Sequence, residues 1–358
     1  MEQFHNAMEM LDLMLQPAFC VREGTIIKVN PAAAALLIET GTNIQPLLHT
    51  GTDEYASFDG GSLYLTLSLS GHPTGASVTR MQDFDVFCIE QDADAHLQAL
   101  ALAARELREP LSGILAVADR VFPAAASTDA STQEHLSHMN RSLFQMLRII
   151  NNMSDARLYA AESESRQEIR DITAVMREIF SRAADLTGHA EISLRYTGPT
   201  ESIYTLLDSQ KLERMVFNLL SNAVKFTPAG GTIEAQLTRR GVKLYLSIQD
   251  SGTGISETVR GSLFSRYLRE PGLEDKRNGL GLGMLLIRST AALHGGTVLI
   301  DHPENTGTRI TVSFTIRQNN ATLRSPRMRI DYAGERDHGL IELSDVLPAS
   351  LYGPEAVN

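Results

Sequence analysis

The chain of 358 residues is long enough for two or three domains that each bury a core, and its formal net charge is −11. That negative charge, without a visible stripe of Lys and Arg, argues against a nucleic-acid-binding surface. The longest apolar runs, such as residues 31–38, are too short to span a membrane, and the two cysteines lack metal-ligand spacing, so we expect a cytoplasmic protein with free thiols.

Residues 1–92 predict a small α/β domain. The segments 17–21 and 25–29 indicate two strands, and Asn30-Pro31 favours the start of an alanine-rich helix. Leucines at every second position from 63 to 69, and the apolar run 86–89, indicate further strands. This order of a strand pair, a helix and three strands resembles a PAS sensor domain. A dimerisation module without a ligand is the alternative.

Residues 93–165 predict two long amphipathic helices that form an antiparallel hairpin. Apolar residues recur at spacings of three, four or seven from Leu100 to Val121, and with the alternation of a coiled-coil seam from Leu136 to Met153. The segment 122–131, rich in Ala, Ser and Thr, is expected to turn the chain between them. Because two such helices usually pair with a second copy, we expect a homodimer built on a four-helix bundle.

Residues 166–317 contain three motifs that favour a nucleotide site. Residues 208–226 predict one helix, on which Asn218, Asn222 and Lys225 share a face. An amide oxygen on this face suits Mg²⁺, which takes few protein ligands, and the ammonium group suits phosphate oxygens. The second motif is Asp250 with Gly252 and Gly254, after a strand at 242–249. The third, Gly279-Leu280-Gly281-Leu282-Gly283, opens a helix whose N–H groups can bind phosphate.

These motifs, in this order, resemble the N box and the two glycine boxes of sensor histidine kinases, and residues 263–267 resemble their F box. The resemblance implies an α+β multidomain chain in which the third domain has the α/β-sandwich fold of GHKL (Bergerat, HATPase_c) ATP-binding domains. It implies ATP and Mg²⁺ as cofactors, with Asn222 as the metal ligand and Asp250 as the acceptor for the adenine amino group. The ATP-binding residues that it implies are Asn218, Asn222, Lys225, Asp250, Gly252, Gly254, Gly279, Leu280, Gly281, Leu282, Gly283 and Thr308.

Asn218 also limits the chemistry that the resemblance implies. Related gyrase, mismatch-repair and heat-shock chaperone ATPases have a Glu at this position, which activates a water molecule. Because an amide cannot act as that base, rapid ATP hydrolysis is not expected.

The hairpin resembles the dimerisation and phosphotransfer domain of the same family at residues 104–111. Glu106 and four neighbours match the family pattern, but Arg105 stands where the phosphoacceptor histidine is found. A guanidinium group, with a pKa above about 12, has no free lone pair to attack a γ-phosphate. Self-phosphorylation at Arg105 is therefore not expected. The resemblance implies that Arg105 and Glu106 occupy the catalytic positions of this helix. We interpret the other hairpin histidines as polar residues on a solvated face; these are His96, His135 and His138.

Residues 318–358 form a C-terminal tail outside the resemblance. Residues 328–332 alternate as an added strand would, and residues 340–343 and 346–347 are too apolar for a disordered tail. We therefore expect the tail to dock on its own chain or on a partner.

The sequence thus predicts a cytoplasmic protein of the sensor histidine kinase family that binds Mg-ATP in two-component signal transduction. Its expected partners are a second copy, through the hairpin, and a response regulator or partner kinase. Two activities are compatible with Arg105. The chain either transfers the γ-phosphoryl group to a histidine on another protein, or it is a pseudokinase whose ATP binding sets the shape of a regulatory dimer.

Overall fold

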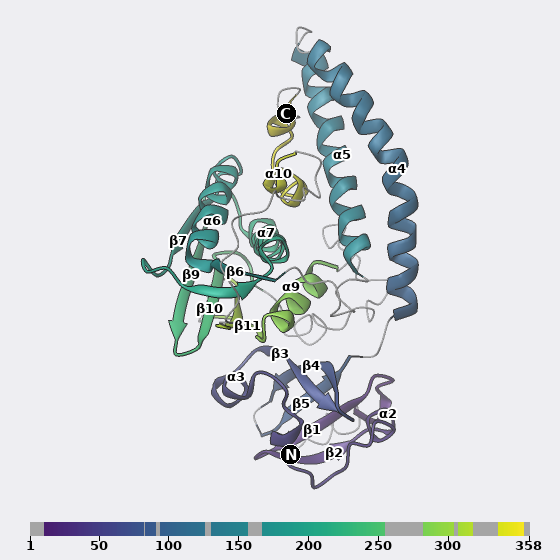
Figure 1. The fold of residues 1–358 in the computed structure, drawn as a ribbon, viewed down its shortest axis with the longest axis vertical. Helices are drawn as coiled ribbons and strands as arrows, with labels where there is room; N and C mark the ends of the chain where they lie inside the picture. The colour runs from purple at the N-terminus through teal and green to yellow at the C-terminus, as the bar shows by residue number, and fades with distance from the viewer. Residues whose placement is uncertain are drawn as a thin grey trace.

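The structure is a computed structural model that describes residues 11–81, 83–90, 94–125, 130–156, 167–254, 282–303, 307–317 and 336–353. Figure 1 shows an N-terminal strand-rich part below a mixed α/β part, with a pair of long helices beside the latter. No helix in these ranges is long and apolar enough to cross a membrane.

The N-terminal part is an antiparallel sheet with short helices. The strand order is β2-β1-β5-β4-β3, and Asn30 caps the first helix by accepting a hydrogen bond from the Ala33 N–H. The rings of Phe19 and Phe87 stack in its core with their centroids 4.8 Å apart. The strands predicted from the sequence are confirmed to within one residue. The elements are β1 (Ala18–Arg22), β2 (Thr25–Val29), α2 (Pro31–Ala34), η1 (Gln45–Leu47), α3 (Thr52–Ser57), β3 (Ser62–Leu69), β4 (His72–Arg80) and β5 (Asp85–Ile89).

Both cysteines lie in this sheet as free thiols. Cys20 is buried, whereas Cys88 is only half-buried. Burial raises the pKa of each thiol to about 11, so both are protonated at neutral pH.

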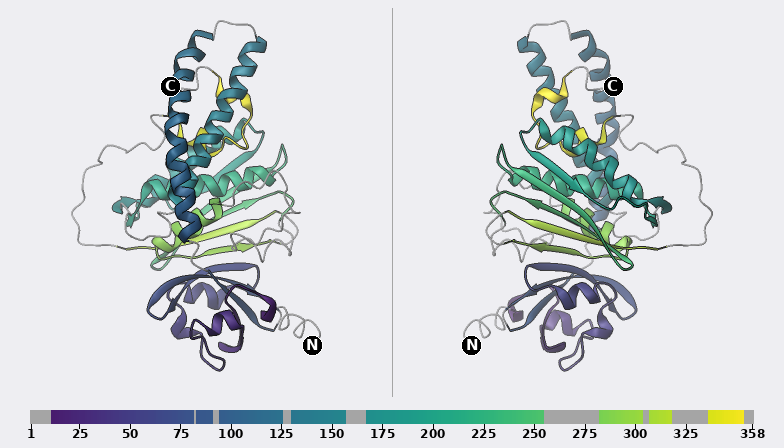
Figure 2. Two further views of the ribbon diagram at one scale, coloured as in Figure 1. Left: turned by 90° about the vertical axis from the view of Figure 1, so that its right-hand side faces the viewer. Right: turned by 90° about the vertical axis from the view of Figure 1, so that its left-hand side faces the viewer.

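Helices α4 (Asp94–Ala125) and α5 (Ala130–Ala156) lie side by side along most of their length (Figure 2). The turn predicted at 122–131 is wrong in extent, because α4 continues through Ala125 and α5 begins at Ala130. Alanine has the highest helix propensity of all residues, so the alanines at 124 and 125 extend the first helix rather than end it. The apolar residues buried along the helix pair include Leu111, Leu115, Leu143, Leu147 and Ile150.

The mixed part is a sheet covered on one face by three helices. Its strand order is β11-β12-β10-β9-β7, in which β7 is parallel to β9 and the other neighbours are antiparallel. Along β10, buried and half-buried residues alternate, as in a strand with one covered face. The elements are β6 (Glu168–Asp171), α6 (Ile172–Gly188), β7 (Ser193–Thr197), β8 (Tyr204–Leu207), α7 (Ser209–Phe226), β9 (Thr232–Arg240), β10 (Lys243–Asp250), α9 (Leu282–Leu293), β11 (Val298–Asp301) and β12 (Arg309–Thr315).

The sheet of the N-terminal part and the five-stranded sheet of the mixed part are continuous, whereas β6 and β8 form a separate pair. Strand β3 pairs antiparallel with β11, with Tyr64 opposite Val298 and Ser62 opposite Ile300, so that one ten-stranded sheet runs through both parts. The carboxylate of Glu54 accepts two hydrogen bonds from Lys243 Nζ of β10, at 2.7 and 2.6 Å. The alternation of residues within a strand does not reveal which edge the strand pairs with, so this pairing could not be predicted from the sequence.

The C-terminal tail docks on its own chain, which confirms one of the two expected modes. Helix α10 (His338–Glu342) lies between α5 and α7, and the short 3-10 helix η3 (Ala349–Tyr352) lies against α5 (Figure 1). The ring of Tyr352 packs edge-on against Phe144 of α5, with the centroids 5.3 Å apart. The strand predicted at 328–332 lies outside the described residues.

Two glycine substitutions test the sheet junction. Gly61 has φ +85°, and a Cβ there would lie 2.1 Å from the carbonyl oxygen of Ile300 in β11, whereas Gly41 has φ +84° and open space around it. Alanine at either position costs about 1–2 kcal/mol for the left-handed backbone. We expect Gly61→Ala to lower the free energy of unfolding by about 1–3 kcal/mol more, because β11 must move away from the added methyl group. Urea unfolding measures both variants, and equal losses of stability would show that β3 and β11 are not in contact.

Candidate nucleotide-binding site

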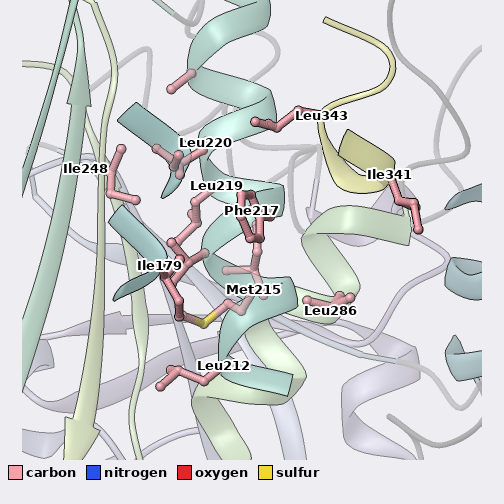
Figure 3. Packing of buried hydrophobic residues seen from close by; sticks show 14 of the residues in the cluster. Ile179, Leu212, Met215, Phe217, Leu219, Leu220, Ile248, Leu286, Ile341 and Leu343 are labelled. Carbon is pink, nitrogen blue, oxygen red and sulfur yellow. The ribbon is translucent and has the colours of Figure 1, made fainter. Parts of the chain in front are cut away.

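Helix α7 carries the first group of candidate residues. Asp208 begins the helix, since its carboxylate accepts a hydrogen bond from the Lys211 N–H at 3.1 Å. Figure 3 shows Met215 and Leu219 on the side of the helix that faces Ile179 and Ile248. The spacing of the three polar candidates keeps them on another face, where Asn218 is buried and Asn222 and Lys225 are half-buried.

Asp250 ends strand β10 in a buried position with 6% of its surface exposed. Its Oδ1 accepts hydrogen bonds from the backbone N–H groups of Gly252, at 2.8 Å, and Thr308, at 3.2 Å. Burial raises the pKa of this carboxyl above its ordinary value, and the two N–H donors act in the opposite direction by favouring the ionised form. Both of these described bonds end on Oδ1.

Two glycines bring the motifs together. A Cβ at Gly252 would lie 2.2 Å from the carbonyl oxygen of Phe226, the last residue of α7. A Cβ at Gly283, in the first turn of α9, would lie 2.8 Å from Oδ1 of Asn218. Only residues without a side chain permit both approaches, so the end of β10 and the start of α9 lie against α7.

Only some of the remaining candidate residues of the glycine motifs lie in the described part of the chain. Gly254 has φ +73° and lies beside the ring of His302, and Thr308 is buried next to Asp250. Leu282 is the buried first residue of α9. Gly279, Leu280 and Gly281 lie outside the described residues, as does the segment 263–267.

His294 has a structural role in this region that no pattern in the sequence predicts. It lies just after α9, where its Nε2 accepts a hydrogen bond from the Asp208 N–H at 3.1 Å, and its Nδ1 lies 2.7 Å from the carbonyl oxygen of Thr290. Nε2 is therefore the unprotonated nitrogen and Nδ1 the donor. Burial lowers the pKa of His294, so the ring stays neutral and joins the end of α9 to the start of α7.

The candidate residues of the hairpin lie on α4 and α5. Arg105 and Glu106 are both exposed on α4, and His135 and His138 are exposed on α5. Arg108 joins the two helices, because its Nη2 donates to the Ser154 hydroxyl at 2.9 Å. The side chain of His96 lies outside the described residues.

Asn218 also contacts the C-terminal tail, which the sequence analysis missed. Its Nδ2 donates to the backbone carbonyl of Arg214 at 2.9 Å and lies 3.4 Å from Oε2 of Glu342. Residue 342 is separated from Asn218 by more than a hundred positions, and no local pattern could relate the two.

A metal at this site would depend on amide and phosphate oxygens. Within the described ranges, no group of three or more His, Cys, Asp or Glu side chains is arranged to hold a metal ion. The amide of Asn222 on the polar face of α7 is compatible with Mg²⁺, because this ion keeps several waters and needs few protein ligands.

The chain is similar in sequence to known proteins. Residues 207–318 match the family model of the histidine kinase-, DNA gyrase B-, and HSP90-like ATPases. The chain is 28% identical over 232 residues to Histidine kinase P4 of Formosa agariphila, covering 63% of this chain and 17% of that protein. It is 29% identical over 222 residues to Histidine protein kinase DivJ of Caulobacter vibrioides, covering 61% and 37%. It thus spans less than half the length of these relatives.

A solved structure shows a similar fold. The crystal structure of full-length ShkA in complex with AMPPNP superposes with a TM-score of 0.50 at 23% identity, covering 62% of this chain and 47% of that one. Residues 207–318 thus match the ATPase family model, and the chain is similar in sequence to histidine kinases.

Proposed function

We propose that residues 166–317 bind ATP together with Mg²⁺. The observation that carries this proposal is the position of Asp250, buried at a strand end with Oδ1 held by two backbone N–H groups, beside the polar face of α7. Oδ2 of Asp250 accepts the adenine amino group. Asn222 ligates the metal, and Lys225 and the N–H groups at the start of α9 bind phosphate oxygens. Bound ATP supplies a transferable γ-phosphoryl group.

We propose that the N-terminal and helical parts serve as input and dimerisation units. The strand order β2-β1-β5-β4-β3 supports a PAS-type sensor for residues 1–92. The pair α4 and α5, within residues 93–165, carries exposed apolar residues beside a groove of about 420 Å³, lined in part by Pro110, Ile114 and Val117. A second copy of the chain covers this surface, since water-exposed apolar patches of this kind mark interaction sites.

We further propose that the protein is a cytoplasmic signalling protein that does not phosphorylate itself at position 105. Arg105 is exposed on α4, and a guanidinium group offers no nucleophilic nitrogen. Its partner is a response regulator or a kinase that supplies the missing histidine. Labelling with γ-labelled ATP distinguishes phosphoryl transfer to such a histidine from regulation without phosphoryl transfer.

Nucleotide binding is tested by calorimetry on the full chain. We expect Asp250→Asn to weaken ATP binding about tenfold, because a hydrogen bond to a charged acceptor contributes roughly 1.5–3 kcal/mol. Removal of Mg²⁺ with EDTA should weaken binding to the unmodified chain but have little further effect on Asn222→Ala. Glu234→Gln, at an exposed position of β9, is the control and should bind normally. Unchanged affinity in Asp250→Asn would refute the adenine role.

Dimerisation is tested by light scattering. We expect Ile114→Asp, which places a charge on the exposed apolar surface of α4, to shift the chain from a dimeric to a monomeric mass at micromolar concentration. Ser112→Asp adds the same charge at an exposed polar position of the same helix and should remain dimeric. A monomeric unmodified chain would contradict the proposal.

Self-phosphorylation is tested with γ-labelled ATP. We expect no acid-labile phosphoprotein from the unmodified chain, because Arg105 cannot attack phosphorus. Arg105→His restores labelling if only the nucleophile is missing, whereas Arg105→Gln, which has no nucleophilic nitrogen, does not. Absence of label in Arg105→His with ATP still bound would favour the pseudokinase. Label on the unmodified chain, at His96, His135 or His138, would overturn the assignment.

A further inference from the structure

The tail places a buried carboxylate between two helices. Glu342 has 0% of its surface exposed, and its Oε1 accepts a hydrogen bond from Arg214 Nε of α7 at 3.1 Å. Its Oε2 lies 3.6 Å from Arg148 Nε of α5. Since a fully buried carboxylate is tolerated only when it is paired, this position depends on both arginines.

The same carboxylate determines how the amide of Asn218 is turned. The Nδ2 of Asn218 faces two acceptors, the Arg214 carbonyl at 2.9 Å and Glu342 Oε2 at 3.4 Å. A rotation of the amide by about half a turn would direct Oδ1 at both acceptors, so that acceptor oxygens would face one another, which is unfavourable in a buried position. Oδ1 is therefore directed at the start of α9, next to Gly283.

The carboxylate also joins the hairpin to the nucleotide site. Arg148 donates from Nη2 to the hydroxyl of Ser221 on α7 at 3.1 Å, and its Nη1 pairs with Asp345 of the tail. Arg141 of α5 donates to the backbone carbonyl of Ser344 at 2.9 Å. The tail thus contacts the middle of α5, at Arg141 and Arg148, while Glu342 reaches Asn218.

We infer that Glu342 is a positioning residue of the nucleotide site: it fixes the amide of Asn218 with its oxygen toward the Mg-nucleotide, so that the C-terminal tail completes the site. The inference rests on the proposed function, because it requires that Asn218 faces the nucleotide. The ligand class is a magnesium-bound nucleoside triphosphate. Docking of the tail and tight nucleotide binding are then coupled through one carboxylate.

The test compares two carboxylates that both hold the tail to α7. Glu342→Gln keeps the shape of the side chain but places an NH₂ group or a neutral oxygen where Asn218 needs a charged acceptor. Glu213 of α7 pairs with His338 of the tail at 3.1 Å and has no described contact with Asn218, so Glu213→Gln is the matched control. We expect Glu342→Gln to weaken Mg-ATP binding in calorimetry at least about fivefold, and Glu213→Gln less than about twofold.

The outcomes separate the two proposals. If the unmodified chain does not bind Mg-ATP, the proposed function fails and the inference fails with it. If the unmodified chain binds and Glu342→Gln binds equally well, only the inference is overturned. An equal loss in both variants would also overturn it, because the effect would then come from tail docking in general.

A thermal double-mutant cycle gives a readout without nucleotide. Asn218→Asp places a carboxylate against Glu342, so we expect a large drop in Tm in the unmodified background. In the Glu342→Gln background the glutamine NH₂ can donate to the new carboxylate, and the drop should be about half as large or smaller. Equal drops in the two backgrounds would show that residues 218 and 342 do not interact, even where a variant binds no ATP.

Discussion

The burial of helix α7 is the constraint on which the rest of the structure depends. Eleven of its residues are buried, and its apolar sides face the sheet, α9 and the tail helix at once (Figure 3). A helix enclosed in this way cannot rotate without exposing its core residues, so the polar face with Asn218, Asn222 and Lys225 is held at one angle. Asp208 and His294 fix where the helix begins. The geometry of the candidate site follows from this packing.

Each element that borders the site is also held by another part of the chain. Strand β10 is tied to the N-terminal part by Lys243 and Glu54, and α7 is tied to the tail by Arg214 and Glu342. Helix α9 carries the buried Arg288, which forms an ion pair with Glu90 after β5, and Glu90 accepts a hydrogen bond from Tyr64 at 2.7 Å. Removing one partner of a buried ion pair usually costs about 3–5 kcal/mol. These contacts join the N-terminal part and the tail to the elements that carry the candidate site.

The hairpin has two kinds of surface with different roles. Its inner residues, such as Leu143 and Phe144, are buried against α4 or the tail, whereas Ile114 and Val117 remain exposed. The side occupied by the tail is therefore already covered within one chain. Arg105 lies on α4, outside the network that joins α5 to α7, and its side chain is exposed.

The sequence by itself determined the local elements and the chemistry of the motifs. Helix α7, strand β10 and the polar face of Asn218, Asn222 and Lys225 follow from periodicities of 3.6 and two residues, which depend only on neighbouring positions. The pairing of β3 with β11, the role of His294 and the contact between Glu342 and Asn218 were decided by the tertiary structure alone. They join residues far apart in the chain, and their partners are selected by edge geometry and by the need to pair buried polar groups, which leave no periodic signal in the sequence.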